Sequence, residues 1–453
     1  MPELLKRSRY TLLFPSFDGG AILFNTFSGS LSVLGEEAAR VTRSVLWRPN
    51  FSYQKNGFIQ ARSDLEERGH LVPVSRDELA LMALRHRQGR RDRSEFGLTL
   101  APTGNCNLRC TYCYQGDHGP LAWSAQVEHA VTEFVSRRLP RGATLSVIWY
   151  GGEPLLALDV VLRTSRVLMD LARQRDCSWQ CEMVTNGLLL SEKVVRSLAE
   201  IECRDFQISL DGPKEVHDRM RPTKLGQGSF DLIMKNLETL DLDQVEVGLR
   251  INVTKNNVDA VPELLKHLAR LGLAAKLNLS LAPVEALTRS CAGIAQHCLD
   301  IPDFADWHFQ TMQLMDELGF ATESLPLPVT NHCGADREYS FVIDWQGDVY
   351  KCWNEVGDPE HSIGNVLRGG GHPNQGHLLG RVGSLAGQGV QALPFVAGLH
   401  GGLSAPGPHQ RQPAKALPVY EIQICGLSQL PYLEGPSPSF GCRFRPTDRR
   451  LIL

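Results

Sequence analysis

The sequence predicts an α/β fold with six β/α units in its central part. Between residue 96 and about residue 319, short apolar runs alternate with amphipathic helical patterns, which is typical of helices packed around a parallel sheet. The chain has 453 residues, enough for two or three domains, and its 42% hydrophobic and 21% charged residues are typical of a globular protein. We therefore expect a partial (β/α)6 barrel of the TIM type with smaller flanking units.

The expected elements of the barrel follow from hydrophobic periodicity. Strands are predicted over 96–100, 145–150, 181–185, 206–210, 247–253 and 277–281, and helices near 122–138, 157–174, 191–201, 229–240, 258–271 and 303–318. In such a barrel the chemistry is carried by the loops at the carboxyl ends of the strands.

The flanking segments differ in composition. Residues 1–84 contain short strands and two helical stretches, which predicts a small α+β domain, and the arginine-rich segment 85–95 is typical of a solvated linker. Residues 331–366 contain a predicted hairpin that turns at residues 345–348. Residues 366–420 hold twelve Gly, four His and no Asp or Glu, so we expect the tail 367–453 to be poorly ordered.

Charge and the start of the chain exclude several functions. The 47 Lys and Arg nearly balance 50 Asp and Glu, so no overall field favours nucleic acid or an anionic membrane as a partner. No apolar signal region and no run of about 18 apolar residues is present. We expect a cytoplasmic protein, in which close groups of cysteines indicate metal or redox chemistry rather than disulfides.

One such group follows the first barrel strand. Cys106, Cys110 and Cys113 form a CxxxCxxC pattern on a loop between a strand and a helix. A structural zinc site needs a fourth ligand, and His118 is the only near candidate. Three cysteines on a 4Fe-4S cluster instead leave one iron free to bind a substrate or cofactor.

This motif resembles that of the radical S-adenosylmethionine (SAM) superfamily, in which an aromatic residue precedes the last cysteine, as Tyr112 does here. Further motifs at the strand ends support the resemblance: a GGEP segment, Thr-Asn-Gly and Ser-Leu-Asp-Gly-Pro. The resemblance covers roughly residues 96–366. It implies cofactor contacts at Tyr112, Gly151, Gly152, Glu153, Pro154, Asn186 and Ser209. In this family the GGEP segment holds the SAM amino group, and the glutamate is a charge-matched acceptor for it.

The resemblance also implies a mechanism. A 4Fe-4S cluster donates one electron to SAM, and the resulting 5'-deoxyadenosyl radical abstracts a hydrogen atom from the substrate. The implied partners are a precursor peptide or protein and an electron donor such as flavodoxin or ferredoxin. No residue is assigned as a general base.

Cysteines near the C-terminus resemble the beginning of a SPASM or twitch extension, which holds auxiliary clusters in peptide-modifying relatives. Cys333 and Cys352 match its opening, but a full SPASM extension continues with a longer cysteine set, and only Cys425 and Cys442 remain. These four thiols suffice for one auxiliary cluster and not for two. One hypothesis is that the reading frame changes shortly after Val366; the alternative is a divergent insert.

Two substrate classes are compatible with the resemblance. Anaerobic sulfatase-maturing enzymes, which make formylglycine, carry an aspartate as base after the second SPASM cysteine, where this chain has Trp353. We therefore favour a maturase of ribosomally made peptides. Residues 1–84 are then either a winged-helix-like domain that receives a leader peptide by strand addition or a structural cap without a partner. A degenerate protein that binds cluster and peptide without turnover is the third alternative.

Overall fold

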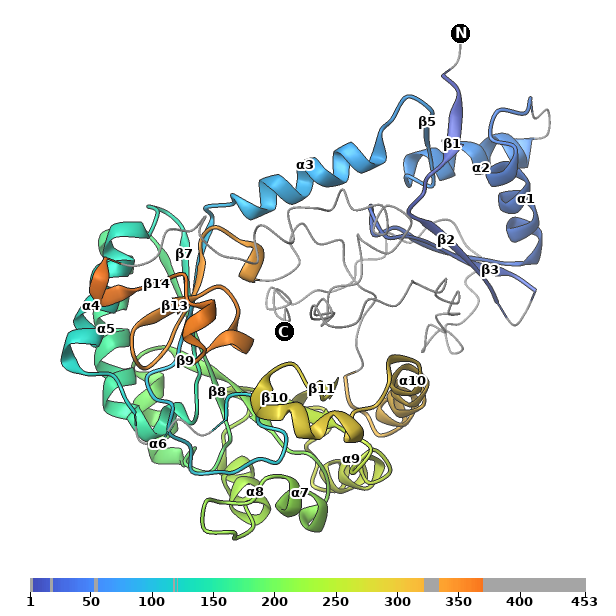
Figure 1. The fold of residues 1–453 in the computed structure, drawn as a ribbon. Helices are drawn as coiled ribbons and strands as arrows, with labels where there is room; N and C mark the ends of the chain where they lie inside the picture. Colours follow the sequence, from blue (N-terminus) through green and yellow to red (C-terminus); the bar gives the residue numbers. More distant parts are fainter. Residues whose placement is uncertain are drawn as a thin grey trace.

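The computed structural model describes residues 3–16, 19–52, 56–116, 119, 121–321 and 334–369, with the backbone alone at residues 289 and 290 (Figure 1). Several predicted features lie outside the described residues. They are the candidate cluster ligands Cys333, Cys425 and Cys442, the zinc candidate His118 and the tail from residue 370 onward.

The N-terminal part is a small α+β unit with its own core. Its three-stranded antiparallel sheet has the order β2-β3-β4, and β1 pairs with β5. Leu23, Val45 and Leu71 are among the buried residues that join these strands to the helices. The elements are β1 (Leu5–Arg7), β2 (Thr11–Pro15), β3 (Ala21–Asn25), β4 (Leu31–Leu34), α1 (Glu36–Trp47), α2 (Asn56–Glu67) and β5 (Leu71–Pro73).

Helix α3 (Glu78–Arg90) connects this unit to the barrel (Figure 1). The segment expected to be a solvated linker is therefore helical over its first residues. Near its end, His86 Nε2 lies 2.5 Å from Asp336 Oδ2, and Arg90 Nε lies 3.3 Å from Asp336 Oδ1. These contacts fix α3 against the segment that precedes the C-terminal hairpin.

The barrel contains six parallel strands that neighbour one another in chain order, which confirms the predicted α/β class. They are β6 (Glu95–Leu100), β7 (Thr144–Trp149), β8 (Ser178–Thr185), β9 (Cys203–Ser209), β10 (Glu246–Val253) and β11 (Leu277–Pro283). The helices between and after them are α4 (Ala125–Arg138), α5 (Leu158–Gln174), α6 (Glu192–Ala199), α7 (Lys214–Met220), α8 (Phe230–Thr239), α9 (Val261–Arg270) and α10 (Ile301–Glu317), with 3-10 turns η1 (Pro154–Ala157) and η2 (Arg289–His297). Of these helices, α7 alone was not expected, because it is short and polar.

Strand alternation produces the core. Along β6, the buried Phe96, Leu98 and Leu100 alternate with half-buried residues, and β7 repeats the pattern. The buried side chains pack with the inner faces of the surrounding helices into one large core. Because all six strands are parallel, their carboxyl ends and the loops that follow them lie at one edge of the sheet.

A small extension continues the sheet beyond β6. Strand β12 (Ser340–Ile343) pairs parallel with β6, and β13 (Asp348–Tyr350) and β14 (Gly364–Asn365) add antiparallel strands. The predicted hairpin is thus present, and Gly347 in its turn has a φ of 81°, a conformation that favours glycine. The remaining 3-10 turns are η3 (Gly334–Asp336), η4 (Trp353–Glu355), η5 (Pro359–His361) and η6 (Val366–Arg368).

No helix in the described part of the chain is long and apolar enough to cross a membrane.

Candidate active site

The cysteine loop, which we define as residues 101–114, begins directly after β6 at the carboxyl edge of the sheet. Its three thiols are half-buried and lie within electrostatic range of one another. Burial raises the pKa of Cys106, and it raises the pKa of Cys110 to about 12, while the nearby Arg221 lowers the latter. Thiolates at these positions need a positive partner such as iron.

The cysteine loop rests on the Gly151–Pro154 segment through backbone contacts. Gly152 N donates to Thr103 O at 3.1 Å, and Glu153 N donates to Asn105 O at 2.8 Å. A Cβ on Gly151 would lie 2.6 Å from Thr103 O, and one on Gly152 would overlap Asn105 O. The two glycines therefore let the backbone of the cysteine loop approach.

Glu153 is fully buried beneath this contact. Its carboxylate accepts hydrogen bonds from Thr185 Oγ1 at 2.8 Å, from Asn186 N at 2.8 Å and from Leu155 N at 3.1 Å. Burial raises its pKa, and these hydrogen bonds oppose the rise. In this structure the carboxylate connects the Gly151–Pro154 segment to the end of β8, rather than presenting an open acceptor for an ammonium.

The other residues expected at the cofactor lie around the same edge. Asn186 Nδ2 donates to Asn107 Oδ1 at 2.6 Å and lies 3.8 Å from Cys106 Sγ, so it contacts the cysteine loop directly. Pro154 is buried at the start of η1. Ser209 ends β9 and pairs in register with Arg250 on β10, so its place is on the sheet edge.

Tyr112, near the end of the cysteine loop, is the centre of a hydrogen-bonded network. Its hydroxyl donates to Asp211 Oδ2, and it accepts from Arg221 Nη1 at 2.6 Å and from Asn252 Nδ2 at 3.1 Å. Asn252 N also donates to Asp211 Oδ1 at 2.9 Å. We call these four residues the Tyr112 network; they come from the cysteine loop, the loop after β9, the end of α7 and β10.

Burial raises the pKa of Tyr112 well above its ordinary value, so the hydroxyl stays protonated and donates to the carboxylate. Asp211 belongs to the Ser-Leu-Asp-Gly-Pro motif, but no motif in the sequence pointed to Arg221. An arginine at the end of a seven-residue polar helix has no local pattern that would reveal it.

The C-terminal extension brings two further residues to this edge. The Trp353 ring lies 5.3 Å from the ring of Tyr150, which follows β7. Burial raises the pKa of Tyr150, and negative charge on Cys113 or Cys352 raises it further, so both thiols lie near this tyrosine. Of the other cysteines, Cys181, Cys203 and Cys291 are buried, as expected for small apolar residues.

The donor set can be compared with the metals it would hold. In the described part of the chain, no three His, Cys, Asp or Glu side chains converge closely enough for a single metal ion. Three thiols on one loop give a ligand to three irons of a 4Fe-4S cluster, whereas a tetrahedral structural zinc ion would need a fourth protein ligand.

Comparisons with known proteins place the chain in a family. The family model of the radical SAM superfamily matches residues 100–268. The mycofactocin maturase MftC of Mycobacterium tuberculosis (strain H37Rv) is 30% identical over 290 residues, which is 61% of this chain and 69% of that protein. The chain belongs to the radical SAM superfamily. Enzymes of this superfamily use a 4Fe-4S cluster and SAM.

Other radical SAM relatives extend the comparison. A cysteine-type anaerobic sulfatase-maturating enzyme of Clostridium perfringens (strain ATCC 13124) is 25% identical over 297 residues, covering 60% of this chain and 77% of that protein. The structure of Streptococcus suis SuiB bound to the precursor peptide SuiA aligns with a TM-score of 0.46 at 15% identity, over 80% of this chain and 86% of that one.

Proposed function

We propose that this radical SAM enzyme is a peptide maturase that modifies a ribosomally made precursor peptide. The observation that carries the proposal is the seating of the cysteine loop: its backbone rests on Gly152 and Glu153, so the three thiols are held at the carboxyl edge of the barrel. When bound, the cluster and SAM would supply the 5'-deoxyadenosyl radical. Cys106, Cys110 and Cys113 would hold the cluster, with Gly151–Pro154, Asn186, Ser209 and Tyr112 around the SAM site.

The chain's own residues would position this chemistry and exclude water. Asp211, Arg221 and Asn252 all hydrogen-bond to the Tyr112 hydroxyl, which fixes the cysteine loop at a second place besides its contact with the Gly151–Pro154 segment. The Tyr150 and Trp353 rings form an apolar wall at the same edge. Such a wall would shield a radical from water at the mouth of the barrel.

The N-terminal unit supports a peptide substrate. Strand β4 is paired on one side only, with β3, among the described residues. A free strand edge can receive an extended peptide by backbone hydrogen bonding. The leader of the precursor would bind there, and the modified segment would extend toward the barrel.

Formylglycine formation remains the second candidate because a sulfatase-maturating enzyme is among the relatives. The aspartate expected of that reaction is replaced by Trp353, an indole that packs on Tyr150 and takes no proton. We therefore place peptide maturation first. We also propose a cytoplasmic location and a flavodoxin or ferredoxin as the electron donor.

The test is anaerobic reconstitution of the full chain and of a Cys106/Cys110/Cys113→Ala variant with iron and sulfide. We expect 5'-deoxyadenosine from the wild type alone, and about four irons per chain for one cluster or about eight if an auxiliary cluster is also held. Cys177→Ala, a half-buried cysteine away from the loop, is the matched control and should retain both.

Mass spectrometry then separates the substrate classes. Short peptides encoded beside the gene and a sulfatase-derived cysteine peptide are incubated with enzyme, SAM and dithionite. A mass change in a peptide encoded beside the gene supports the peptide maturase. Formylglycine in the sulfatase-derived peptide would instead support a sulfatase-maturating activity. Bound iron without any 5'-deoxyadenosine would instead show a degenerate, non-catalytic protein.

A further inference from the structure

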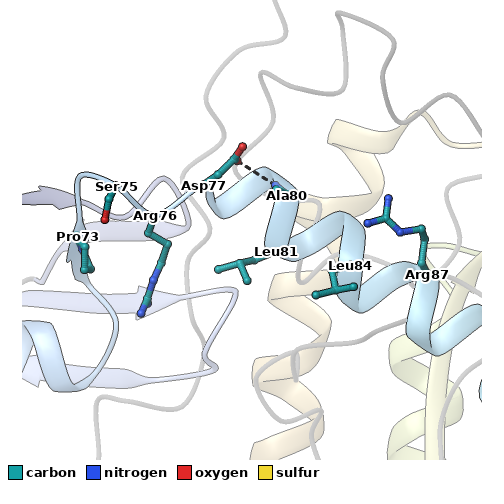
Figure 2. A pocket seen from close by; sticks show the side chains of 8 residues that line it. All are labelled: Pro73, Ser75, Arg76, Asp77, Ala80, Leu81, Leu84 and Arg87. Atoms are coloured by element: carbon teal, nitrogen blue, oxygen red, sulfur yellow. Dashed lines mark hydrogen bonds between the residues drawn. The ribbon is translucent and has the colours of Figure 1, made fainter.

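A surface groove lies where the N-terminal unit meets α3 (Figure 2). One wall is the turn after β5, and the other is one face of α3. The lining residues are Pro73, Ser75, Arg76, Asp77, Ala80, Leu81, Leu84 and Arg87. Arg76 and Leu81 reach toward the same space from the two walls (Figure 2).

The floor of the groove is apolar. Leu81 and Leu84 are three positions apart on α3, so they share a face of the helix, and they are 37% and 44% exposed. Single exposed leucines are ordinary on protein surfaces, but two leucines beside Ala80 and Pro73 in one concave surface form an apolar strip that a ligand can cover.

The rim of the groove carries net positive charge. Arg76 and Arg87 make no ion pair with an acidic side chain of the described residues. Asp77 is the one acid in the lining, and its carboxylate caps α3 by accepting from Ala80 N at 3.0 Å (Figure 2). Just outside, Lys6 Nζ donates to Arg76 O at 2.8 Å, and Ser75 donates to the Glu3 carboxylate at 2.9 Å.

The other arginines and acids of α3 are already engaged. Arg85 donates to Phe27 O at 3.0 Å and lies over the Phe27 ring, and Arg90 pairs with Asp336. Glu78 is buried and accepts from Ser8 Oγ at 2.5 Å. Arg87 is therefore the arginine of the helix that remains available to a ligand in the groove.

We propose that this groove binds an acidic, leucine-containing segment of the precursor peptide, at a site separate from the strand edge of β4. The identity of the peptide as the precursor rests on the proposed function. Leucine side chains would cover Leu81 and Leu84, while carboxylates would pair with Arg76 and Arg87. No aromatic side chain lines the groove to stack on nucleic acid bases.

The groove lies close to the barrel along the chain. Helix α3 is about 20 Å long and leads directly into β6, the first strand of the barrel. A peptide held at the start of α3 is kept near the barrel, which raises the effective concentration of its remaining residues at the carboxyl edge of the sheet.

The test uses the full chain without cluster or SAM, so that it is independent of radical chemistry. The probe is a fluorescein-labelled peptide of about 14 residues that repeats Glu and Leu at helical spacing, titrated by fluorescence anisotropy. We expect saturable binding, and a rise in Kd of about tenfold or more for Leu84→Asp and for Arg87→Glu. A peptide with Lys in place of Glu should bind at least about tenfold more weakly.

Matched variants separate the groove from general effects. Leu79→Asp changes a leucine of the same helix that is 38% exposed and does not line the groove, and Arg204→Glu changes an exposed arginine at the start of β9. Both should change Kd less than about twofold. All four altered positions are exposed, and circular dichroism checks that each variant is folded.

Several outcomes would overturn the proposal. These are equal binding of the lysine peptide, tighter binding of a labelled single-stranded oligonucleotide, loss of binding in the Leu79→Asp control, no binding by the wild type, or a dimer in solution that Leu84→Asp dissociates. If the peptide does not bind the groove, formation of 5'-deoxyadenosine by the wild type still supports the proposed function. If no 5'-deoxyadenosine forms, the anisotropy result still stands for the groove.

Discussion

The cysteine loop is held at two places, which we call its two sides, by contacts of different kinds. On one side, its backbone lies against the backbone of Gly151 and Gly152, with no side chain between them. On the other side, Tyr112 reaches into a network of three side chains. The backbone contact has no freedom to adjust, whereas a side-chain network can lose one hydrogen bond and keep the others. The two sides should therefore differ in their response to substitution.

The largest effect is expected from Gly152→Ala. The new Cβ overlaps Asn105 O, so the cysteine loop must move, at a cost of about 1–3 kcal/mol in stability. Because a small displacement of the ligands misplaces the cluster, SAM cleavage should fall by roughly tenfold or more. Iron content after reconstitution measures cluster binding, and the amount of 5'-deoxyadenosine measures SAM cleavage. Gly57→Ala, where a Cβ meets nothing within 4 Å, should leave both unchanged.

Glu153→Gln tests the support beneath the same contact. All three partners of the carboxylate are donors, so the amide group of a glutamine faces a donor and leaves it unpaired. We expect the free energy of unfolding to fall by about 1–3 kcal/mol in urea titrations. Glu133→Gln, in an exposed pair with Arg137, should lose at most about 0.5 kcal/mol; an equal loss would refute the role of the buried carboxylate.

Low pH should reduce the stability of the protein near the Tyr112 network, because His217 is buried beside Asp211. Burial lowers its pKa to about 3, its Nδ1 accepts from Asp211 N, and its Nε2 contacts Ser229 Oγ. The unfolded chain binds a proton below pH 6.5 that the folded chain does not, so stability is full above pH 6.5 and falls as the pH drops toward 3.

This effect amounts to about 2 kcal/mol between pH 7 and pH 5, measured by urea unfolding. His217→Gln should flatten that part of the pH profile. His129→Gln changes an exposed histidine of α4 and should leave the pH profile unchanged. An equally flattened profile in this control would show that the effect is not specific to His217.

The smallest effect is expected from Tyr112→Phe. The variant removes the hydroxyl, but Arg221 Nη1 and Asp211 Oδ2, 3.7 Å apart, still pair, and Asn252 still donates to Asp211. We expect a loss of about 1 kcal/mol in stability and less than about a tenfold loss of SAM cleavage. Tyr339→Phe, half-buried at the start of β12, is the control. A defect as large as that of Gly152→Ala would remove the distinction between the two sides.

Local patterns made much of the fold predictable. Apolar alternation located all six barrel strands to within a few residues, and helical periodicity located the barrel helices except for the short α7. Helix α3 was missed, because its arginine-rich end is typical of a solvated linker. The cysteine motif and the GGEP segment were both placed after strands, and because parallel strands end at one edge, their proximity followed as well.

The sequence by itself determined the class of the fold, the family and the edge at which the thiols meet, because each depends on residues close together in the chain. Only the tertiary structure decided which groups complete the site. Arg221 meets Tyr112 across 109 residues and Asn252 meets it across 140, and Glu153 turns toward Thr185 rather than outward. Such contacts arise from the packing of distant loops at the sheet edge, where no periodicity along the chain records which side chains will touch.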